Sequence, residues 1–285
     1  MASVGLIGIG LVGTAVSERL LADGFVVVGF DVDPAATERL ANLGGTVVES
    51  AAAAVAACDE VLLSLPRSSD VVEVLTSCAH ALHDDQLIVD TSTGAPEDAQ
   101  HCGRLCAKRG VRFVEATILG SSQQVREASA VAMLGGEDAA RTRAENIVTH
   151  FTSQIFHVGP LGQASRMKLA VNLVLGINRA ALAEGLAFAR AVELDLPQAL
   201  EVFRAGAAYS RVMDAKGEKM LQREFTPQAK LSQHHKDVRL IRQAAAAANL
   251  VLPLTDAHEQ LLTAAERAGH AASDNCAVIA AYDRP

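Results

Sequence analysis

The stretch that decides the fold lies at the start of the chain and reads Val4-Gly5-Leu6-Ile7-Gly8-Ile9-Gly10-Leu11-Val12-Gly13. The apolar residues before Gly8 predict a short buried strand, because such a run ending in glycine is typical of one. The glycines at positions 8, 10 and 13 have the G-x-G-x-x-G spacing. In that pattern the first glycine permits a tight turn, the second lets the backbone approach a pyrophosphate, and the third lets the next helix pack closely. The stretch therefore predicts a strand, a phosphate-binding turn and a helix whose amino end faces the phosphates.

The residues after this turn supply the context that a glycine motif needs before it indicates nucleotide binding. A second apolar run, residues 25–30, ends in Asp31, roughly 20 residues after the glycines, where a ribose-binding acid is expected. A carboxylate there accepts hydrogen bonds from the ribose hydroxyls and repels a 2′-phosphate. The next residues are Val32, Asp33 and Pro34, none of which is a cation. We therefore expect NAD as the cofactor and NADP as the less favoured alternative.

Composition limits the class of protein. The 285 residues are 50% hydrophobic and 20% charged, as in a globular chain long enough for two domains. The net charge of −8 argues against a nucleic-acid partner, which requires basic patches. No apolar run approaches the ~20 residues of a membrane span, and the start lacks the basic region and cleavage site of a secretory leader. We expect a cytoplasmic protein with no membrane partner.

The cysteines indicate free thiols rather than disulfides. There are five of them, an odd number, and none has C-x-x-C spacing. Cys102 and Cys106 share a helix face, so a metal site is conceivable there. Buried thiols are ordinary core residues, however, and we expect no metal.

Strands and helices alternate along the first half of the chain. After Asp31 the pattern predicts strands near residues 46–48, 60–65, 86–89, 111–114, 130–134 and 154–158. Strands separated by helices of this length predict a mostly parallel sheet with crossover helices. We therefore expect residues 1–161 to form an α/β domain of the Rossmann type, with its ligands at the carboxyl ends of the strands.

The second half has a helical pattern. Beyond Gly159-Pro160-Leu161-Gly162, residues 164–192 carry apolar residues at helical spacing for longer than an average helix. Shorter helices are predicted near residues 197–205, 210–222, 231–247 and 253–268. We expect residues 162–285 to form an all-α domain. Its long helix is apolar on more than one side, which predicts a homodimer or homotetramer formed through this domain.

Lys168 and Asn172 are the most informative polar residues of the long helix. They are four residues apart and therefore project from one face near its amino end. Their neighbours, including Leu169 and Leu173, are apolar. Partial removal from water would make a lysine there a usable proton donor or acceptor. The alternative is a surface lysine whose stem lies along apolar groups.

Several segments together resemble the β-hydroxyacid dehydrogenase family, over nearly the whole chain. The resemblance rests on the glycine turn, Leu65-Pro66, Asp90-Thr91-Ser92-Thr93 with Pro96, residues 159–162, Lys168 to Asn172, and Lys236-Asp237. It implies an NAD(P)-dependent oxidoreductase that interconverts a small β-hydroxy acid, or a close analogue, and its oxo form.

The resemblance also implies catalytic roles. Lys168 stands where the family has its catalytic lysine, which exchanges a proton with the substrate hydroxyl while hydride moves to or from nicotinamide. Asn172 stands where an asparagine holds that lysine and the substrate. The family's other asparagine in this motif is replaced here by Val171.

Further positions are implied to contact the ligands. Thr93 matches a residue near the nicotinamide, and Lys236 matches a lysine that reaches the cofactor from the helical domain. Leu65 and Pro66 are expected beside the cofactor, and Ser92 beside the substrate.

One departure from the family concerns its substrate loop. The family's Asp-Ala-Pro-Val-Ser-Gly-Gly reads Glu115-Ala116-Thr117-Ile118-Leu119-Gly120-Ser121 here. Leu119 replaces the serine that helps to bind the substrate carboxylate, whereas Gly120 matches. Ser121 and Ser122 could supply hydroxyls from another direction, and the backbone N–H groups of Gly120 and Ser121 could bind an anion. Either the substrate differs from a simple 3-hydroxy acid, or its acid group is held differently, or the backbone carries the binding.

Two other functions remain open: a reductase of C=N bonds on the same fold, and a cofactor-binding sensor without turnover. The lysine at position 168 argues against both. Of the remaining polar residues, we expect His234-His235 to be exposed on a helix and Asp274 to cap or pair near the end of the chain. Arg204, Tyr209 and Arg211 could reach a substrate acid.

Overall fold

The computed structural model describes residues 2–283, and the chain divides into two compact units, one ending at Lys168 and the other beginning at Leu169. The first unit contains one eight-stranded sheet in the order β3-β2-β1-β4-β5-β6-β7-β8. Its strands are β1 (Ser3–Ile7), β2 (Val26–Phe30), β3 (Thr46–Val47), β4 (Glu60–Leu63), β5 (Leu87–Asp90), β6 (Arg112–Leu119), β7 (Ala130–Gly135) and β8 (Thr152–Gly159). Neighbouring strands pair in parallel except β6 and β7, which are antiparallel.

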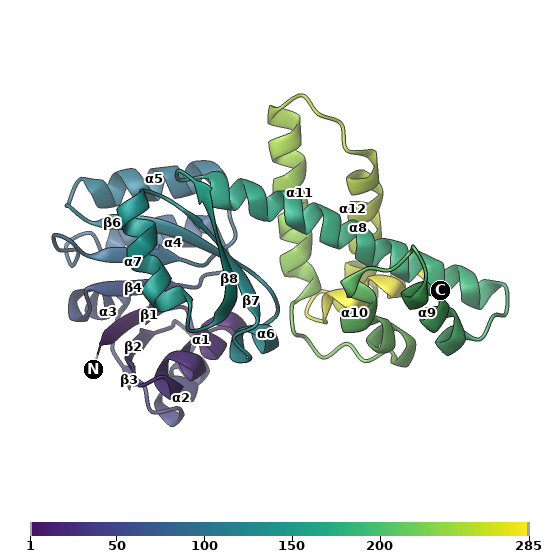
Figure 1. Cartoon of the computed structure of the whole chain (residues 1–285), viewed down its shortest axis with the longest axis horizontal. Helices are drawn as coiled ribbons and strands as arrows, with labels where there is room; N and C mark the ends of the chain where they lie inside the picture. The colour runs from purple at the N-terminus through teal and green to yellow at the C-terminus, as the bar shows by residue number, and fades with distance from the viewer. Residues whose placement is uncertain (1, 284–285) are drawn as a thin grey trace. The chain divides into compact units, whose positions relative to one another are not determined.

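Helices cover both faces of this sheet, as Figure 1 shows. They are α1 (Leu11–Ala22), α2 (Pro34–Asn42), α3 (Ala51–Ala57), α4 (Ser68–Ser77), α5 (Pro96–Ala107), α6 (Ser122–Arg126) and α7 (Asp138–Val148). Successive strand residues point to opposite faces. Leu87 therefore packs in the cluster that includes Val16 of α1, and Ile88 packs in the cluster that includes Leu75 of α4. The predicted Rossmann-type α/β architecture is confirmed.

The order of the strands predicts where a ligand binds. β1 pairs with β2 on one side and with β4 on the other, so the chain reverses its direction of winding at β1. In open parallel sheets, ligands bind outside the carboxyl ends of the strands at this point. The turn of residues 8–13 follows β1 directly.

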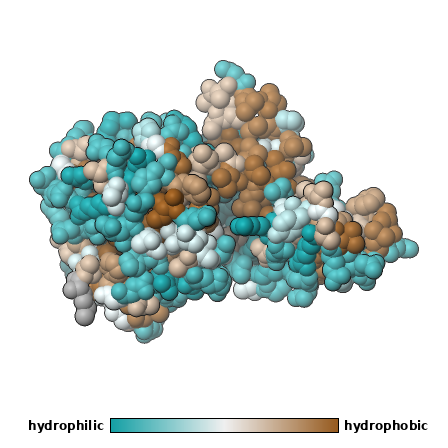
Figure 2. All heavy atoms as spheres, viewed as in Figure 1, coloured by the Kyte–Doolittle hydropathy of each residue, from teal (hydrophilic) through white to brown (hydrophobic). Residues whose placement is uncertain are grey.

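The second unit consists of helices, as expected. They are α8 (Gln163–Ala191), which begins in the first unit, α9 (Leu196–Ala205), α10 (Arg211–Gln222), α11 (Leu231–Ala247), α12 (Pro253–Ala265), a π-helical turn η1 (Glu266–His270) and a 3₁₀ helix η2 (Asn275–Tyr282). Leu182 and Leu186 of α8 pack with Val238 of α11 and Leu262 of α12 in one core. Exposed apolar residues remain on this unit, and Figure 2 shows apolar side chains over α11 and α12.

Three features differ from the sequence-based expectations. β6 was expected to end at residue 114 but continues to Leu119, because Ala116–Leu119 pair with the antiparallel strand β7. Neither the short helix α6 nor the 3₁₀ helix η2 was predicted. The division between the units falls inside α8 rather than at its start, and the predicted domain boundary at residues 161–162 stays a prediction.

One of the described helices, α8, is long and apolar enough to cross a membrane by length and composition alone. That test is weak evidence, since the core helix of a globular domain also passes it. Arg179 and Glu184 interrupt its apolar sequence, and Leu182, Ala183 and Leu186 are buried in the core of the helical unit. Packing within the helical unit therefore accounts for part of its apolar character.

Candidate active site

The glycines of the first turn differ in their surroundings. A Cβ at Gly8, where φ is +94°, would lie 2.3 Å from the Ser64 carbonyl oxygen, and one at Gly13 would lie 2.0 Å from the Gly8 carbonyl oxygen. A Cβ at Gly10 would meet no atom within 4 Å. Gly10 is also the N-cap of α1, and no side chain caps that helix. The open space beside α1's N–H groups fits the pyrophosphate of a dinucleotide.

Asp31 lies against this turn, as its predicted role requires. Its Oδ2 accepts the N–H of Ile9 at 2.6 Å, and its Oδ1 accepts the N–H of Asp33 at 2.8 Å. Arg39 of α2 is close by, since its Nη2 donates to the Ile9 carbonyl oxygen at 3.4 Å. The three residues after Asp31 carry no cation, so the local sequence did not reveal Arg39, which the second turn of α2 brings back toward the glycines.

The ends of β4 and β5 are joined by side chains. The Ser92 hydroxyl accepts the N–H of Leu65 at 2.9 Å, and the Thr91 hydroxyl donates to the Leu63 carbonyl oxygen at 2.8 Å. The Ser92 N–H donates to Asp90. Burial raises the pKa of Asp90 to about 7. These contacts hold Leu65, Pro66 and the half-buried Thr93 at the carboxyl edge of the sheet, beside the glycine turn.

Lys168 is buried at the same edge, with 9% of its surface exposed. Its Nζ donates to the carbonyl oxygen of Ile118, next to the last residue of β6. β1, β4, β5 and β6 run parallel, so their carboxyl ends share one edge of the sheet. The lysine head is therefore on the side of the sheet that carries the glycine turn.

Asn172 lies one turn beyond Lys168 on α8 and has a partner within the helical unit. Its Nδ2 donates to Oδ2 of Asp237 at 2.9 Å, and Oδ1 of the same carboxylate lies 3.0 Å from Nζ of Lys236. Asp237 therefore joins two of the predicted site residues. The sequence motif Lys236-Asp237 contained this residue, but nothing in the sequence showed that its carboxylate links α11 to α8.

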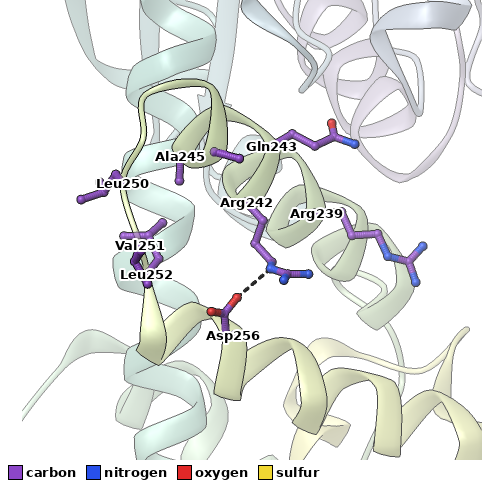
Figure 3. Close-up of a pocket in the computed structure, with 9 residues that line it drawn as sticks. Arg239, Arg242, Gln243, Ala245, Leu250, Val251, Leu252 and Asp256 are labelled. Atoms are coloured by element: carbon purple, nitrogen blue, oxygen red, sulfur yellow. Dashed lines mark hydrogen bonds and ion pairs between the residues drawn. The ribbon is translucent and has the colours of Figure 1, made fainter.

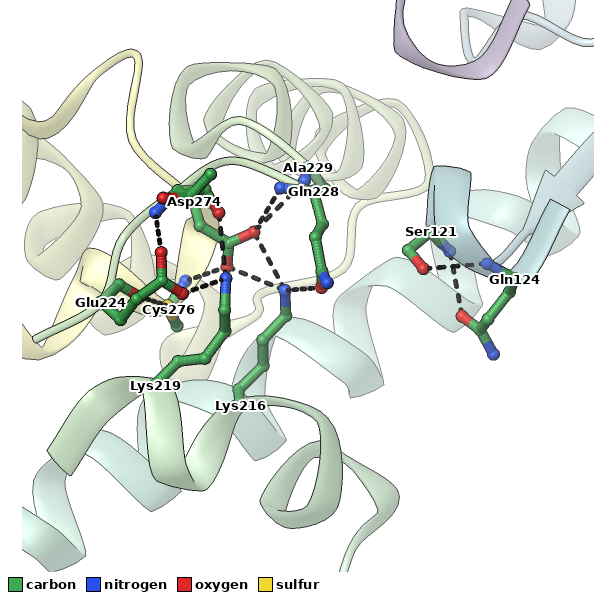
Figure 4. Close-up of polar contacts among 10 residues, drawn as sticks. Ser121, Gln124, Lys216, Lys219, Glu224, Gln228, Ala229, Asp274 and Cys276 are labelled. Atoms are coloured by element: carbon green, nitrogen blue, oxygen red, sulfur yellow. Dashed lines mark hydrogen bonds and ion pairs between the residues drawn. The ribbon is translucent and has the colours of Figure 1, made fainter. Parts of the chain in front are cut away.

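The segment from Leu119 to Ser122 joins the end of β6 to the start of α6 and is held by local hydrogen bonds. Gly120 follows β6 with φ at +150°, and Ser121 caps α6. The Ser121 hydroxyl accepts the N–H of Gln124 at 3.3 Å, while Gln124 Oε1 accepts the N–H of Ser121 at 2.9 Å (Figure 4). Ser122 is buried. The backbone N–H of Ser121, expected to be available to an anion, is therefore engaged within a capping box.

The comparison with known families decides the identity of the fold. A family model described as the NAD binding domain of 6-phosphogluconate dehydrogenase matches residues 3–159. A second, described as the NAD-binding of NADP-dependent 3-hydroxyisobutyrate dehydrogenase, matches residues 162–282. The chain belongs to the β-hydroxyacid dehydrogenase family. It is an oxidoreductase of the hydroxyacid dehydrogenase type with NAD(P)-binding domains.

Relatives in this family match along the full chain. 2-Hydroxy-3-oxopropionate reductase of Escherichia coli is 29% identical, over 98% of this chain and 97% of its own. L-Threonate dehydrogenase of Cupriavidus necator is 27% identical, over 97% of this chain and 95% of its own. Among solved structures, 3-hydroxyisobutyrate dehydrogenase of Mycobacterium tuberculosis with L-serine superposes with a TM-score of 0.89 at 26% identity, and each chain is covered completely. Imine reductase of Pseudomonas sp., at 19% identity and a TM-score of 0.69, shows the fold alone.

Several polar residues outside this β-hydroxyacid dehydrogenase site have structural partners. Asp274 caps η2 and pairs with Lys216, as expected (Figure 4). The expectation that His234 and His235 are exposed is wrong, because they are 6% and 1% exposed between α11 and its neighbours. Because the two histidines are adjacent in the sequence, they form no helical spacing that would have predicted their burial.

The arginine and tyrosine considered for a substrate acid are engaged inside the helical unit. Arg204 pairs with Glu218 at 3.3 Å, and the hydroxyl of Tyr209 donates to Asp214 at 2.5 Å. Arg211 begins α10 and is exposed. The local pairs account for the first two side chains without a substrate.

A groove in the helical unit contains none of the predicted site residues. It has a volume of about 480 Å³ and is lined by Arg239, Arg242, Leu250, Val251 and Asp256, among others (Figure 3). Arg242 Nε is held by Asp256 at 2.7 Å. Among residues 2–283, no three His, Cys, Asp or Glu side chains gather as metal ligands, and the five cysteines are free and buried.

Proposed function

We propose that this protein is an NAD-dependent oxidoreductase that interconverts a small β-hydroxy acid, or a close analogue, and its oxo form, with Lys168 as the acid/base. The observation that carries the proposal is the burial of the Lys168 ammonium at the carboxyl edge of β6, the same edge as the glycine turn. A lysine ammonium carries three N–H donors and is the kind of group that can exchange a proton with a substrate oxygen.

The chemistry divides between cofactor and protein. A nicotinamide cofactor, when bound, would supply hydride transfer at the carbon that carries the hydroxyl or oxo group. In oxidation the Lys168 amine takes the hydroxyl proton, and in reduction the Lys168 ammonium gives a proton to the oxo oxygen. Asn172 orients the substrate from the next turn of α8. Asp237, which accepts the Asn172 amide, keeps that amide in one orientation.

The cofactor preference rests on Asp31. Its carboxylate lies at the turn, where it would accept ribose hydroxyls and repel a 2′-phosphate. Arg39 is the feature that favours NADP, because its guanidinium is near the same turn. We propose NAD because Asp31 is bonded to the turn through its own carboxylate, whereas Arg39 is an exposed side chain on α2. Similar turnover with both cofactors at equal low concentration would overturn this preference.

The other ligand contacts are proposals of the same kind. Leu65, Pro66 and Thr93 would line the cofactor at the ends of β4 and β5, and Lys236 would contact it as well. Ser92, Leu119, Gly120, Ser121 and Ser122 would line the substrate. Because the Leu119 side chain cannot donate a hydrogen bond, we propose that the Gly120 N–H carries more of the binding of the substrate's acid group.

A turnover screen tests the proposal. The panel contains small β-hydroxy acids (3-hydroxyisobutyrate, L-serine and L-threonate among them), simple alcohols and cyclic imines, each with NAD(H) and NADP(H), followed by nicotinamide absorbance. The matched relatives are named after small hydroxy or oxo acids, and these names support the choice of compounds in the panel. We expect at least one β-hydroxy acid to be oxidised with NAD. Reduction of imines alone would favour the imine reductase alternative, and tight NAD binding without any turnover would favour a sensor.

We also propose a homodimer or homotetramer formed through the helical unit, in the cytoplasm. Exposed large apolar residues on that unit support the first part. The five free thiols support a reducing compartment.

A further inference from the structure

Glu115 of β6 is a buried carboxylate whose partners all lie at the start of α8. Only 2% of its surface is exposed. Its Oε2 accepts the N–H of Gly162 at 2.5 Å, its Oε1 accepts the N–H of Ser165 at 3.1 Å, and the Ser165 hydroxyl also donates to Oε1. A carboxylate in this place satisfies N–H groups that the first turn of a helix leaves without partners, and it complements the positive end of the helix dipole.

Two neighbours on the same strand hold the same turn. The Thr117 hydroxyl donates to the Ala164 carbonyl oxygen at 3.4 Å, and the Ile118 carbonyl accepts Lys168 Nζ. Three residues of one strand therefore contact the segment from Gly162 to Lys168. Ser165 and Lys168 are three residues apart on α8, so they share a face of the helix.

The glycine opposite Glu115 on β7 makes room for this carboxylate. On β7, Gly135 pairs with Glu115, and a Cβ at Gly135 would lie 2.7 Å from Glu115 Oε2. Burial raises the pKa of Glu115, and the donors at Ser165 and Gly162 act in the opposite direction. The hydrogen bonds from Gly162 and Ser165 therefore tie this buried acid to the first turn of α8.

We propose that Glu115 is a positioning residue, which fixes the first turn of α8 so that the Lys168 ammonium is presented at the carboxyl edge of the sheet. The inference rests on the proposed acid/base role of Lys168 and adds to it the residue that sets the position of the lysine. Displacement of a reacting group by about 1 Å can cost on the order of 10²-fold in rate. Loss of the Glu115 contacts should therefore lower turnover more than it weakens cofactor binding, because the phosphate-binding residues lie in the turn after β1.

The test is Glu115→Gln, which keeps the shape but replaces one acceptor oxygen with an NH₂ group that faces the N–H donors. Glu137→Gln is the matched control, because Glu137 is exposed in the same unit. The enzyme concentration used to calculate kcat is that of the cofactor-binding sites. We expect kcat to fall by roughly tenfold to 10²-fold, while KM for the dinucleotide stays within about twofold. Glu115→Asp, which retains the charge, should recover part of kcat, and the control should match the unmodified protein.

If Glu115→Gln does not fold, Ser165→Ala takes its place, because it removes one donor to the carboxylate and leaves the backbone contacts. We expect a several-fold lower kcat with an unchanged dinucleotide KM. A kcat within about twofold of the unmodified protein in the folded variant overturns the inference. Lys168→Ala distinguishes a failure of this inference from a failure of the proposed function. If it is inactive while Glu115→Gln is fully active, only the inference fails, and if it is fully active, the proposed function fails with it.

Discussion

The glycine turn contains two residues that the protein itself requires and one that it does not. Gly8 and Gly13 are required by close backbone contacts, whereas a Cβ at Gly10 would lie in open space. The backbone at Gly10, with φ at −72°, is accessible to any residue. The reason for a glycine at position 10 must therefore lie outside the chain, in the ligand.

This difference predicts opposite outcomes for two substitutions. Gly10→Ala should keep the free energy of unfolding within about 1 kcal/mol and weaken NAD binding at least tenfold, because its methyl group would occupy the space of the phosphates. Gly13→Ala should destabilise the folded protein, since its methyl group would overlap the Gly8 carbonyl oxygen. Urea unfolding and cofactor titration measure both. Unimpaired binding by a folded Gly10→Ala protein would show that the phosphates do not lie there.

His258 on α12 predicts a dependence of stability on pH. It is 2% exposed, and its ring lies 5.2 Å from the ring of His234. Burial lowers the pKa of His258 from 6.5 to about 4, with smaller contributions from Arg179 and His235. The folded state therefore resists protonation, so the stabilisation is complete above pH 6.5 and is lost as the pH falls toward 4. Its full size is about 3 kcal/mol.

The measurement compares urea unfolding of the unmodified protein with His258→Gln at about pH 7.5 and about pH 4.5. The unmodified protein should lose about 2 to 3 kcal/mol more than the variant on acidification. Taking the difference removes the opposite effect of Asp90, whose raised pKa favours the folded state at low pH. His80→Gln, at an exposed position, is the control. Parallel pH profiles for the two proteins would contradict the assignment.

At the scale of elements, Asp274 holds the end of the chain onto the helical unit. None of its surface is exposed, and Lys216 Nζ of α10 lies 2.8 and 3.0 Å from its two oxygens. The N–H groups of Gln228 and Cys276 also donate to it. Burial raises the pKa of Asp274, but Lys216 and these N–H groups outweigh it and lower the pKa to about 2.

Removing one member of this pair should be costly. Asp274→Ala leaves the Lys216 ammonium buried with the Gln228 side chain as its remaining acceptor among residues 2–283, so the free energy of unfolding should fall by about 3 to 5 kcal/mol. Asp283→Ala, which removes a half-exposed partner of Arg190 and Arg223, should cost no more than about 1 kcal/mol. Chemical denaturation of both variants provides the measurement. Equal losses would mean that Asp274 does not anchor η2.

Elements were predictable where a local pattern defines them. The 29-residue helix α8 was expected at residues 164–192 and is found at Gln163–Ala191, because its apolar spacing is long and regular. The second half of β6 was not predicted, because Ala116–Leu119 become a strand through pairing with β7, which lies later in the chain. Non-local partners of this kind leave no mark in a single sequence.

The same division applies to the site. The roles of the spaced glycines and of Asp31 were predictable from the sequence, because a backbone conformation and a charge each restrict the residue type. Glu115, Asp237 and Arg39 were not, because each acts through a contact between distant segments. An acid in a strand and an arginine in a helix look ordinary until the fold supplies their partners.

At the scale of the whole molecule, the surface of the helical unit predicts self-association. Phe188 and Val202 are 66% and 64% exposed, and Leu194 between them is 56% exposed. Large exposed apolar side chains on one unit are typical of an interaction surface. We expect a dimer or tetramer by light scattering at micromolar concentration. Phe188→Glu with Val202→Glu should shift the protein toward a smaller species, whereas Val32→Glu, on the other unit, should not. A monodisperse unmodified monomer would refute the proposal.

The central claim is that Lys168 moves the substrate proton, and it is tested most directly by the turnover of Lys168→Ala on the best substrate of the screen. The variant should bind NAD with unchanged affinity, because the phosphates are expected at the turn of residues 8–13, whereas Lys168 donates to Ile118 of β6. Its kcat should fall by roughly 10²- to 10⁴-fold, the usual contribution of a placed acid or base. A kcat within about twofold of the unmodified enzyme, with NAD bound normally, would contradict the account.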